Sequence, residues 1–288
     1  MAYTTIPKSS DYFNTLLYTG TGAENAQTGV GFQPDLTWLK RRNGIGSHRL
    51  FDAVRGATKE IFADATLAES TDAQSLKSFD SDGFTLGTGG ATNGSGNTYA
   101  NWNWLANGAG SANTVGDIAS TVSANTTSGF SVVSYTGNNA SGATVGHGLS
   151  SAPKMVIGKA ITSSGEDWFV GHSSIGFDKY LKLNTTDAAN TTSVIFNNTA
   201  PSNSVVTLGN NGAVNSASYN YIMYCFADVQ GYSKFGSYTG NGSTDGPFVY
   251  TGFKPAFVIT KRTDSGGSWG MNDNKRPNYN PENLYLIA

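Results

Sequence analysis

Short apolar runs separated by polar turn segments follow one another along the whole chain. Residues 129–135 and 84–86 alternate between apolar and polar side chains, which indicates strands with one buried face. No stretch repeats apolar residues at the spacing i, i+3, i+4, i+7 over three turns, so long amphipathic helices are not expected. Turn signals recur about every eight to twelve residues, as in sandwich folds. The pattern predicts an all-β protein made of antiparallel β-sandwiches.

The tripeptide Tyr-Thr-Gly marks an internal repeat, because it occurs three times. Its copies begin at Tyr18, Tyr135 and Tyr238. Each copy is followed by a proline and then by an apolar run that ends in a basic residue; these runs are Leu36–Lys40, Met155–Lys159 and Phe257–Lys261. Self-similarity of this kind indicates one structural unit used repeatedly. We therefore expect tandem jelly-roll-like sandwich domains, the last of them incomplete.

The repeats predict the domain boundaries. We expect an N-terminal arm (1–10), a first sandwich (11–108), a flexible linker (109–127), a second sandwich (128–230) and a partial third sandwich (231–288). The linker is predicted because its segment holds Gly, Ala, Ser, Asn and Thr with almost no apolar bulk. The third repeat has no counterpart of the strands that close the first. Either the chain continues past Ala288, which we favour, or another chain supplies those strands.

The strand that closes each complete repeat predicts which side chains are buried. In 98–106 we expect Trp102 and Trp104 to face the core, with Asn101 and Asn103 on the opposite parity facing mostly water. Matching Ala106 with Ala227 places Met223 and Cys225 at the two tryptophan positions. Cys225 is then a small buried apolar residue, and no histidine lies near it in sequence to make it a nucleophile.

Composition excludes several classes of protein. Charged residues make up 13% of the chain, against about 25% in ordinary globular domains. The net charge of −2 gives no reason to expect nucleic acid or an anionic membrane as a partner. A single cysteine cannot form an intramolecular disulfide, and no signal peptide or apolar membrane-spanning run is present. We expect a protein made in a cytosol.

A family resemblance rests on several motifs of the first repeat. They are Tyr18-Thr19-Gly20, Gly31-Phe32-Gln33-Pro34-Asp35, Trp38-Leu39-Lys40, Leu50-Phe51-Asp52-Ala53-Val54-Arg55-Gly56, and Phe79-Asp80-Ser81-Asp82-Gly83-Phe84. This series resembles a repeat domain of virion structural and tail-fibre proteins of tailed phages, especially those infecting marine bacteria. Such domains are similar to concanavalin-like and laminin-G-like jelly rolls. The second repeat departs from the pattern at 150–154, and the family offers no catalytic residues that carry over.

Four residues are candidates for glycan contact. Trp168 and Trp269 follow Gly/Ser turns at matching places in repeats two and three, and an exposed indole stacks well on a sugar. His48 and His172 fall at roughly corresponding places after the basic strand. The alternatives are burial for the tryptophans, which we favour, and ordinary solvated loops for the histidines.

The one basic cluster is a candidate docking surface for an acidic virion partner. It comprises Lys40, Arg41, Arg42, Arg49 and Arg55, and its alternative is a solvated rim balanced by nearby carboxylates. Asp80-Ser81-Asp82-Gly83 resembles the start of a calcium loop, but an Asx-type turn is favoured. The three histidines have no metal-ligand spacing, and we find no carboxylate pair, nucleophile elbow or phosphate loop. No catalytic residue, metal or cofactor is predicted.

These observations predict a non-enzymatic structural protein of a phage virion, assembled in the host cytoplasm and displayed on the virion surface. Its place would be a tail fibre or surface appendage. By analogy with other fibres, its partners would be other tail or capsid proteins, further copies of itself in a homotrimer, and a host surface glycan. A capsid decoration protein that stabilises the head is the alternative. A glycan-degrading enzyme is a second alternative, and it requires a cleft with two carboxylates.

Overall fold

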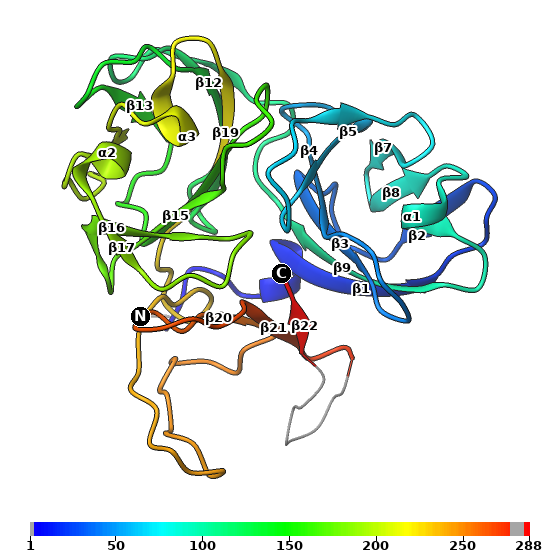
Figure 1. The fold of residues 1–288 in the computed structure, drawn as a ribbon. Coiled ribbons are helices and arrows are strands. Elements are labelled where there is room, and N and C mark those ends of the chain that lie inside the picture. The colour runs from blue at the N-terminus through cyan, green and yellow to red at the C-terminus, as the bar shows by residue number, and fades with distance from the viewer. Residues whose placement is uncertain (1–2, 277–284) are drawn as a thin grey trace.

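The chain forms three lobes around a common centre, and the lobes follow the three sequence repeats (Figure 1). The structure is a computed structural model that describes residues 3–276 and 285–288. Strands dominate it, and in the described part all pairings between named strands are antiparallel. The predicted all-β class is thereby confirmed.

The first lobe is a sandwich of two sheets. The larger has the strand order β1-β9-β3-β4-β5-β6 and the smaller has β2-β8-β7. Its elements are η1 (Ser9–Asp11), β1 (Phe13–Thr19), β2 (Asn25–Thr28), β3 (Leu36–Arg41), β4 (Arg49–Asp52), β5 (Lys59–Phe62), β6 (Ser70–Thr71), β7 (Leu76–Asp80), β8 (Gly83–Leu86), α1 (Gly90–Asn93) and β9 (Thr98–Trp104). Buried residues such as Leu39, Phe51 and Phe84 form the core between the two sheets.

The second lobe repeats this plan with extra strands. Its larger sheet has the order β10-β11-β12-β19-β14-β15-β16-β17, and β13 pairs with β18. Its elements are β10 (Ser111–Asn113), β11 (Ser120–Asn125), β12 (Phe130–Thr136), β13 (Thr144–Gly146), β14 (Met155–Ala160), β15 (Phe169–His172), β16 (Gly176–Lys182), β17 (Asn190–Thr191), α2 (Ser193–Phe196), β18 (Val205–Thr207), α3 (Gly212–Asn215) and β19 (Asn220–Phe226). The run from β12 to β17 matches the run from β1 to β6 strand for strand.

The segment 109–127, expected as a flexible linker, forms β10 and β11 instead. β11 pairs with β12 along its whole length, and β10 adds the edge strand. Small side chains still pack there, because Ser120, Val122 and Ser123 are buried. Composition is misleading in this case because strand pairing uses the backbone, and small residues are enough to cover the edge of a sandwich.

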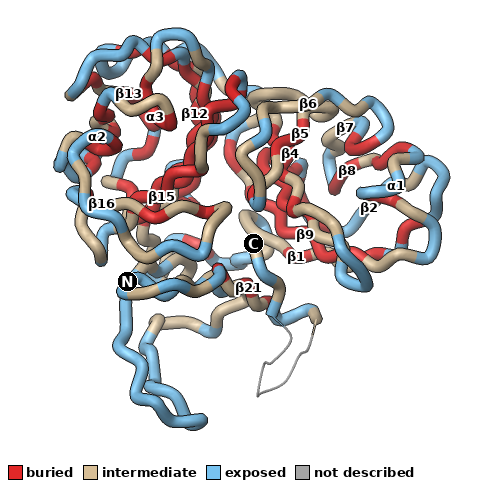
Figure 2. Tube along the Cα trace, in the orientation of Figure 1, coloured by how far each residue is buried: buried red, intermediate tan, exposed pale blue. Residues whose placement is uncertain are grey.

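The third lobe consists of a single sheet with the order β20-β21-β22. The strands are β20 (Phe257–Thr260), β21 (Gly270–Asp273) and β22 (Leu286–Ile287), and they correspond to β3, β4 and β5 of the first lobe. Between the second lobe and β20, residues 236–250 are exposed throughout and form no strand (Figure 2). In the described residues, therefore, this lobe has the inner sheet of a sandwich without the covering layer.

The recurring Tyr-Thr-Gly motif has a structural role in the two complete lobes. The ring of Tyr18 stacks on Tyr99 at 4.9 Å between centroids, and that of Tyr135 stacks on Tyr221 at 5.0 Å. The hydroxyl of Tyr18 donates to a backbone carbonyl of α1 at 2.6 Å, and the hydroxyl of Tyr135 donates to one of α3 at 2.8 Å. A side chain on Gly20 would put its Cβ 2.3 Å from the carbonyl oxygen of Gly94, so this close approach of two backbones requires glycine.

Strand register corrects the expected match between the two closing strands, β9 and β19. Trp102 pairs with Trp38 on β3, and Tyr224 pairs with Ile157 on β14, so Trp102 corresponds to Tyr224 and not to Met223. A slip of one residue exchanges the two faces of a strand. Met223 and Cys225 therefore lie in the internal core of the second lobe, and the predicted burial of Cys225 is confirmed.

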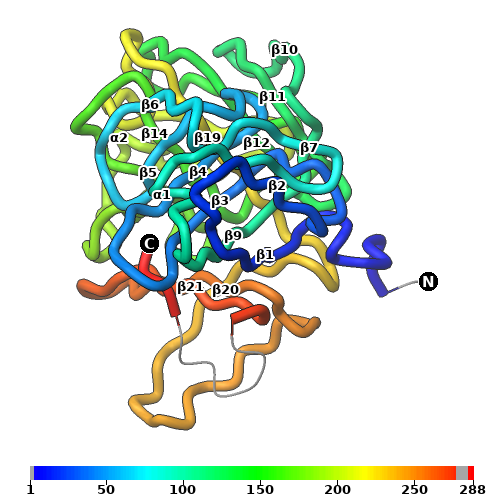
Figure 3. The backbone as a smooth tube through the Cα atoms, turned by 90° about the vertical axis from the view of Figure 1, so that its right-hand side faces the viewer, coloured from blue at the N-terminus to red at the C-terminus, as the bar shows by residue number. Residues whose placement is uncertain are grey.

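The expectation that one face of β9 meets water is wrong. Asn101 and Asn103 are fully buried, because both faces of the closing strand are covered. One face lies inside its own sandwich, and the other lies in a core that all three lobes share. That shared core contains Trp102 from the first lobe, Trp168 from the second and Trp269 from the third. Viewed from the side, the third sheet lies beneath the other two lobes (Figure 3).

Candidate functional site

One contact between lobes is made three times by residues at the same place in the repeat. The residue just before β4, β15 or β21 uses a ring nitrogen to bond a backbone carbonyl of a neighbouring lobe. Trp168 Nε1 donates to Phe62 O at 2.8 Å, and Trp269 Nε1 donates to Lys182 O at 2.8 Å. His48 Nε2 lies 2.5 Å from Ile287 O. The acceptors lie in the equivalent strands β5, β16 and β22, so these contacts close a ring of three lobes.

His48 takes part in this ring as a neutral imidazole. Its Nδ1 accepts a hydrogen bond from Trp38 Nε1 at 2.8 Å, which leaves the proton on Nε2 to be donated to Ile287 O. Burial lowers the pKa of His48 to about 3, and the nearby Lys40 adds to the effect. The ring therefore remains uncharged at neutral pH, which is the form that both hydrogen bonds need.

Burial removes Trp168, Trp269 and His48 from the set of residues that can touch a glycan. Trp168 and His48 are 0% exposed and Trp269 is 3% exposed, so none offers a ring face to a sugar. The structure agrees with the favoured interpretation that Trp168 and Trp269 are buried. It does not agree with the alternative in which their rings stack on a sugar. The sequence alone could not show what the buried rings contact, because their partners lie about a hundred residues away in a different repeat.

The histidines do not form the equivalent pair that the sequence suggested. His172 lies at the end of β15, a place taken by Asp52 at the end of β4. It is half-buried, its Nδ1 accepts from Ser174 N, and its ring lies 6.1 Å from Phe235. Burial lowers the pKa of His172. His172 therefore contacts the start of the third repeat, while His48 contacts its last strand.

A second repeated contact joins an Asp-x-x-Arg corner to a neighbouring lobe. After β4, Arg55 Nε bonds Asp52 Oδ2 at 2.6 Å, and the hydroxyl of Tyr224 on β19 donates to the same oxygen at 2.8 Å. After β21, Arg276 Nε bonds Asp273 Oδ2 at 2.7 Å, and that oxygen accepts Trp102 Nε1 on β9 at 3.0 Å. Each corner thus holds the closing strand of another lobe.

The charges in these corners are compensated locally. Burial by itself would lower the pKa of Arg55, but Asp52 and then Tyr224 and Glu69 raise it above its ordinary value. The guanidinium also donates to the backbone carbonyls of Leu50 and Lys59. Removing one partner from a buried charge that is paired and hydrogen-bonded in this way is strongly destabilising.

The basic cluster does not form one docking patch. Arg55 is buried in its corner, and Arg49 forms an ion pair with Glu60. Lys40 donates to the carbonyl of Gly46 within its own hairpin. The remaining members are Arg41 and the exposed Arg42. Both arginines lie at the tip of the β3–β4 hairpin, where Ile45 is fully exposed between them and His48.

The Asp80–Gly83 segment is a turn between β7 and β8. Asp82 accepts the backbone N–H groups of Gly29 and Gly31, and Asp80 accepts the hydroxyls of Ser78 and Thr85. The hydrogen bonds from the two glycines lower the pKa of Asp82. Within residues 3–276 and 285–288, no group of three or more His, Cys, Asp or Glu side chains is placed to hold a metal ion.

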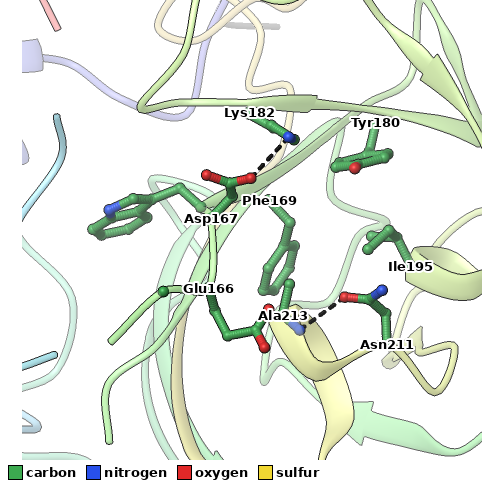
Figure 4. Close-up of a pocket in the computed structure, with 10 residues that line it drawn as sticks. Glu166, Asp167, Phe169, Tyr180, Lys182, Ile195, Asn211 and Ala213 are labelled. Atoms are coloured by element: carbon green, nitrogen blue, oxygen red, sulfur yellow. Dashed lines mark hydrogen bonds and ion pairs between the residues drawn. The ribbon is translucent and has the colours of Figure 1, made fainter. Parts of the chain in front are cut away.

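A polar cavity of about 200 Å³ opens in the second lobe (Figure 4). Glu166, Asp167, Tyr180, Lys182 and Asn211 line it together with the ring of Phe169. Sequence reasoning missed it because its residues come from four separate segments. No spacing motif links them.

The two carboxylates in this cavity do not work as a pair. Asp167 bonds Lys182 Nζ at 2.8 Å and accepts from Asn184 Nδ2 at 2.8 Å, whereas Glu166 points the other way, towards α3 (Figure 4). Burial alone would raise the pKa of Asp167, but the hydrogen bonds from Lys182 and Asn184 outweigh it and lower the pKa. A glycosidase needs a protonated acid facing a second carboxylate across the scissile bond. Asp167 is held ionised and faces a lysine.

A family model described as a domain of unknown function (DUF7483) matches residues 8–288. No curated protein and no solved structure matches the chain. Among the described residues, none of the helices has the length and apolar character needed to cross a membrane.

Proposed function

This chain belongs to the family of the domain of unknown function DUF7483, and we propose its function from its motifs and its architecture. The proposal is a non-enzymatic structural protein of a tailed-phage virion, located in a tail fibre or surface appendage. The resemblance of the first repeat to virion repeat domains supports the phage setting. The all-β tandem architecture supports the structural role.

The observation that carries the proposal is the contact made three times between lobes. Trp168, Trp269 and His48 each bond a backbone carbonyl of another lobe from a buried position. Separating the lobes would exchange each of these hydrogen bonds for bonds to water, at a net cost of about 0.5–1.5 kcal/mol each, and would expose the apolar side chains of the shared core to water. The three repeats therefore behave as one stiff body. Stiffness of this kind suits a protein that must keep its shape on the outside of a particle.

The proposal includes contacts with other virion proteins and assembly into a homotrimer. The exposed hairpin tip with Arg41, Arg42 and Ile45 is the described surface that best suits an acidic and partly apolar partner. Contact with a host glycan, if it is part of the function, falls to exposed loops and not to the buried indoles.

Reconstruction of an intact virion that carries this chain tests the proposal. We expect density for the three-lobed body at the tail or an appendage, and we expect particles that lack the protein to adsorb poorly while their heads stay intact. Density at regular lattice positions on the head, with fragile heads in its absence, would replace the proposal with capsid decoration. A chain found only outside the particle would contradict both.

A further inference from the structure

The third lobe has a free strand edge where the other two lobes have a closing strand. β9 lies between β1 and β3, and β19 lies between β12 and β14. In the described residues, β20 pairs only with β21, so its other edge is open. An unpaired edge presents backbone donors and acceptors that are ready to bind another strand.

The same gap explains why the third Tyr-Thr-Gly copy has no structural role. Tyr18 and Tyr135 stack on tyrosines of their closing strands, and both are buried. Tyr238 is 58% exposed, and the residues around it form no strand. Val258 on β20 is 40% exposed, although its counterpart Val156 on β14 is fully buried. The first strand and the outer face of the third lobe therefore both lack a partner.

We propose that the edge of β20 binds an extended polypeptide segment with the pattern Tyr-x-x-aromatic-x-aromatic. The pattern is that of both closing strands, which read Tyr99, Trp102, Trp104 in β9 and Tyr221, Tyr224, Phe226 in β19. The segment runs antiparallel to β20 and joins it to residues 233–239. The completed sheet then has the strand order of the first lobe.

The register of the existing lobes places each aromatic side chain of the bound segment. Trp104 pairs with Leu36 in the first lobe, and Phe226 pairs with Met155 in the second. The residue of β20 that corresponds to Leu36 and Met155 is Phe257. The last aromatic of the segment therefore lies opposite Phe257, and the middle one lies opposite Ile259. Its tyrosine lies beside Tyr238, where it makes the ring stack that the other two lobes have. Phe257 and Ile259 already pack on the shared core, so the new side chains extend it.

The chemistry of the middle position differs from that in the other lobes. Tyr224 and Trp102 each donate to a corner aspartate, Asp52 or Asp273. The corresponding corner of the second lobe has His172 and Ile175, and Phe235 lies beside His172. The carboxylate near His172 is that of Asp228, which is half-buried and already accepts hydrogen bonds from Phe235 N at 2.8 Å and Lys234 Nζ at 3.4 Å. It is not a fully buried corner acceptor like Asp52, so the middle residue of the segment needs no donor. An apolar aromatic ring fits this position.

A peptide of residues 97–107, labelled with fluorescein, tests this inference against the full chain by fluorescence anisotropy. The matched control carries Asn101→Trp, Trp102→Asn, Asn103→Trp and Trp104→Asn, so it has the same composition with the two tryptophans on the other face. We expect saturable binding of the first peptide and at least tenfold weaker binding of the control, because a shift of one residue reverses the faces of a strand. Hydrogen exchange should show new protection of the amides of residues 235–239 and 257–260.

Variants of the chain locate the site. Tyr238→Ala should weaken binding of the peptide about threefold or more through loss of the ring stack, whereas Tyr250→Ala, which removes another exposed tyrosine, should leave it unchanged. Equal binding of the two peptides overturns the inference, as does the absence of saturable binding. A dimer of the chain that protects the β20 amides and excludes the peptide would show a second copy as the occupant, and it would also overturn it.

Discussion

Replacing Tyr224 with phenylalanine removes one hydroxyl from the contact between the first and second lobes. That hydroxyl donates to Asp52 Oδ2 at 2.8 Å, and the side chain is 1% exposed. Asp52 keeps its bonds from Arg55, so it is not left as an unpaired charge. A hydrogen bond to a charged group contributes about 1.5–3 kcal/mol. We expect Tyr224→Phe to lower the free energy of unfolding by about 2 kcal/mol, which lowers the melting temperature of a chain of this length that unfolds as one unit by roughly 3 °C.

Urea unfolding followed by tryptophan fluorescence measures this loss, because Trp102 and Trp168 lie in the shared core. The control is Tyr238→Phe, which removes the hydroxyl of a tyrosine that is 58% exposed and should change the free energy by less than about 0.5 kcal/mol. The slope of the denaturation curve should stay the same in both variants. A Tyr224→Phe protein as stable as the wild type would refute the claim that this contact joins the lobes.

Three further predictions concern single residues. The folded pKa of His48, about 3, lies below its ordinary value of about 6.5, so the unfolded chain binds a proton that the folded chain does not, and stability falls as pH drops from 6.5 towards 3. The loss at pH 4.5 should be about 2.5 kcal/mol in urea titrations, and His48→Gln should remove this part of the pH dependence; an unchanged dependence would contradict the assignment. Gly20→Ala should cost at least about 2 kcal/mol in thermal unfolding, because its Cβ would lie 2.3 Å from Gly94 O, whereas Gly90→Ala, with open space around it, should cost little. Burial raises the pKa of the Cys225 thiol to about 12, so Ellman's reagent should react with it at pH 8 only after unfolding, and fast reaction of the native protein would show that the site opens.

The sequence predicts the parts of this fold that depend on local pattern. Alternating strands and the three Tyr-Thr-Gly copies indicate a repeated all-β unit, and the absence of histidine near Cys225 indicates a structural cysteine. These features depend on the spacing of residues along the chain, and this spacing can be read directly from the sequence. Strands β12 and β8 also lie where the alternation in 129–135 and 84–86 predicts them.

The contacts between lobes could not be predicted in the same way. Periodicity shows that a strand face is buried but not whether it lies in its own sandwich or against another lobe. For this reason Asn101 was expected in water and is fully buried. The role of Trp168 depends on the carbonyl of Phe62 in the preceding repeat, and no local signal marks that carbonyl as an acceptor. The cavity around Asp167 and Lys182 is likewise assembled from distant segments.

The shared core is the central feature of this structure, and differential scanning calorimetry of the whole chain tests it most directly. If the three lobes are held together by one core, they unfold together, and the calorimetric enthalpy should equal the van't Hoff enthalpy in a single transition. Independent lobes would instead give two or more separate transitions, each with the enthalpy expected for a domain of its own size. That second result would contradict the account given above.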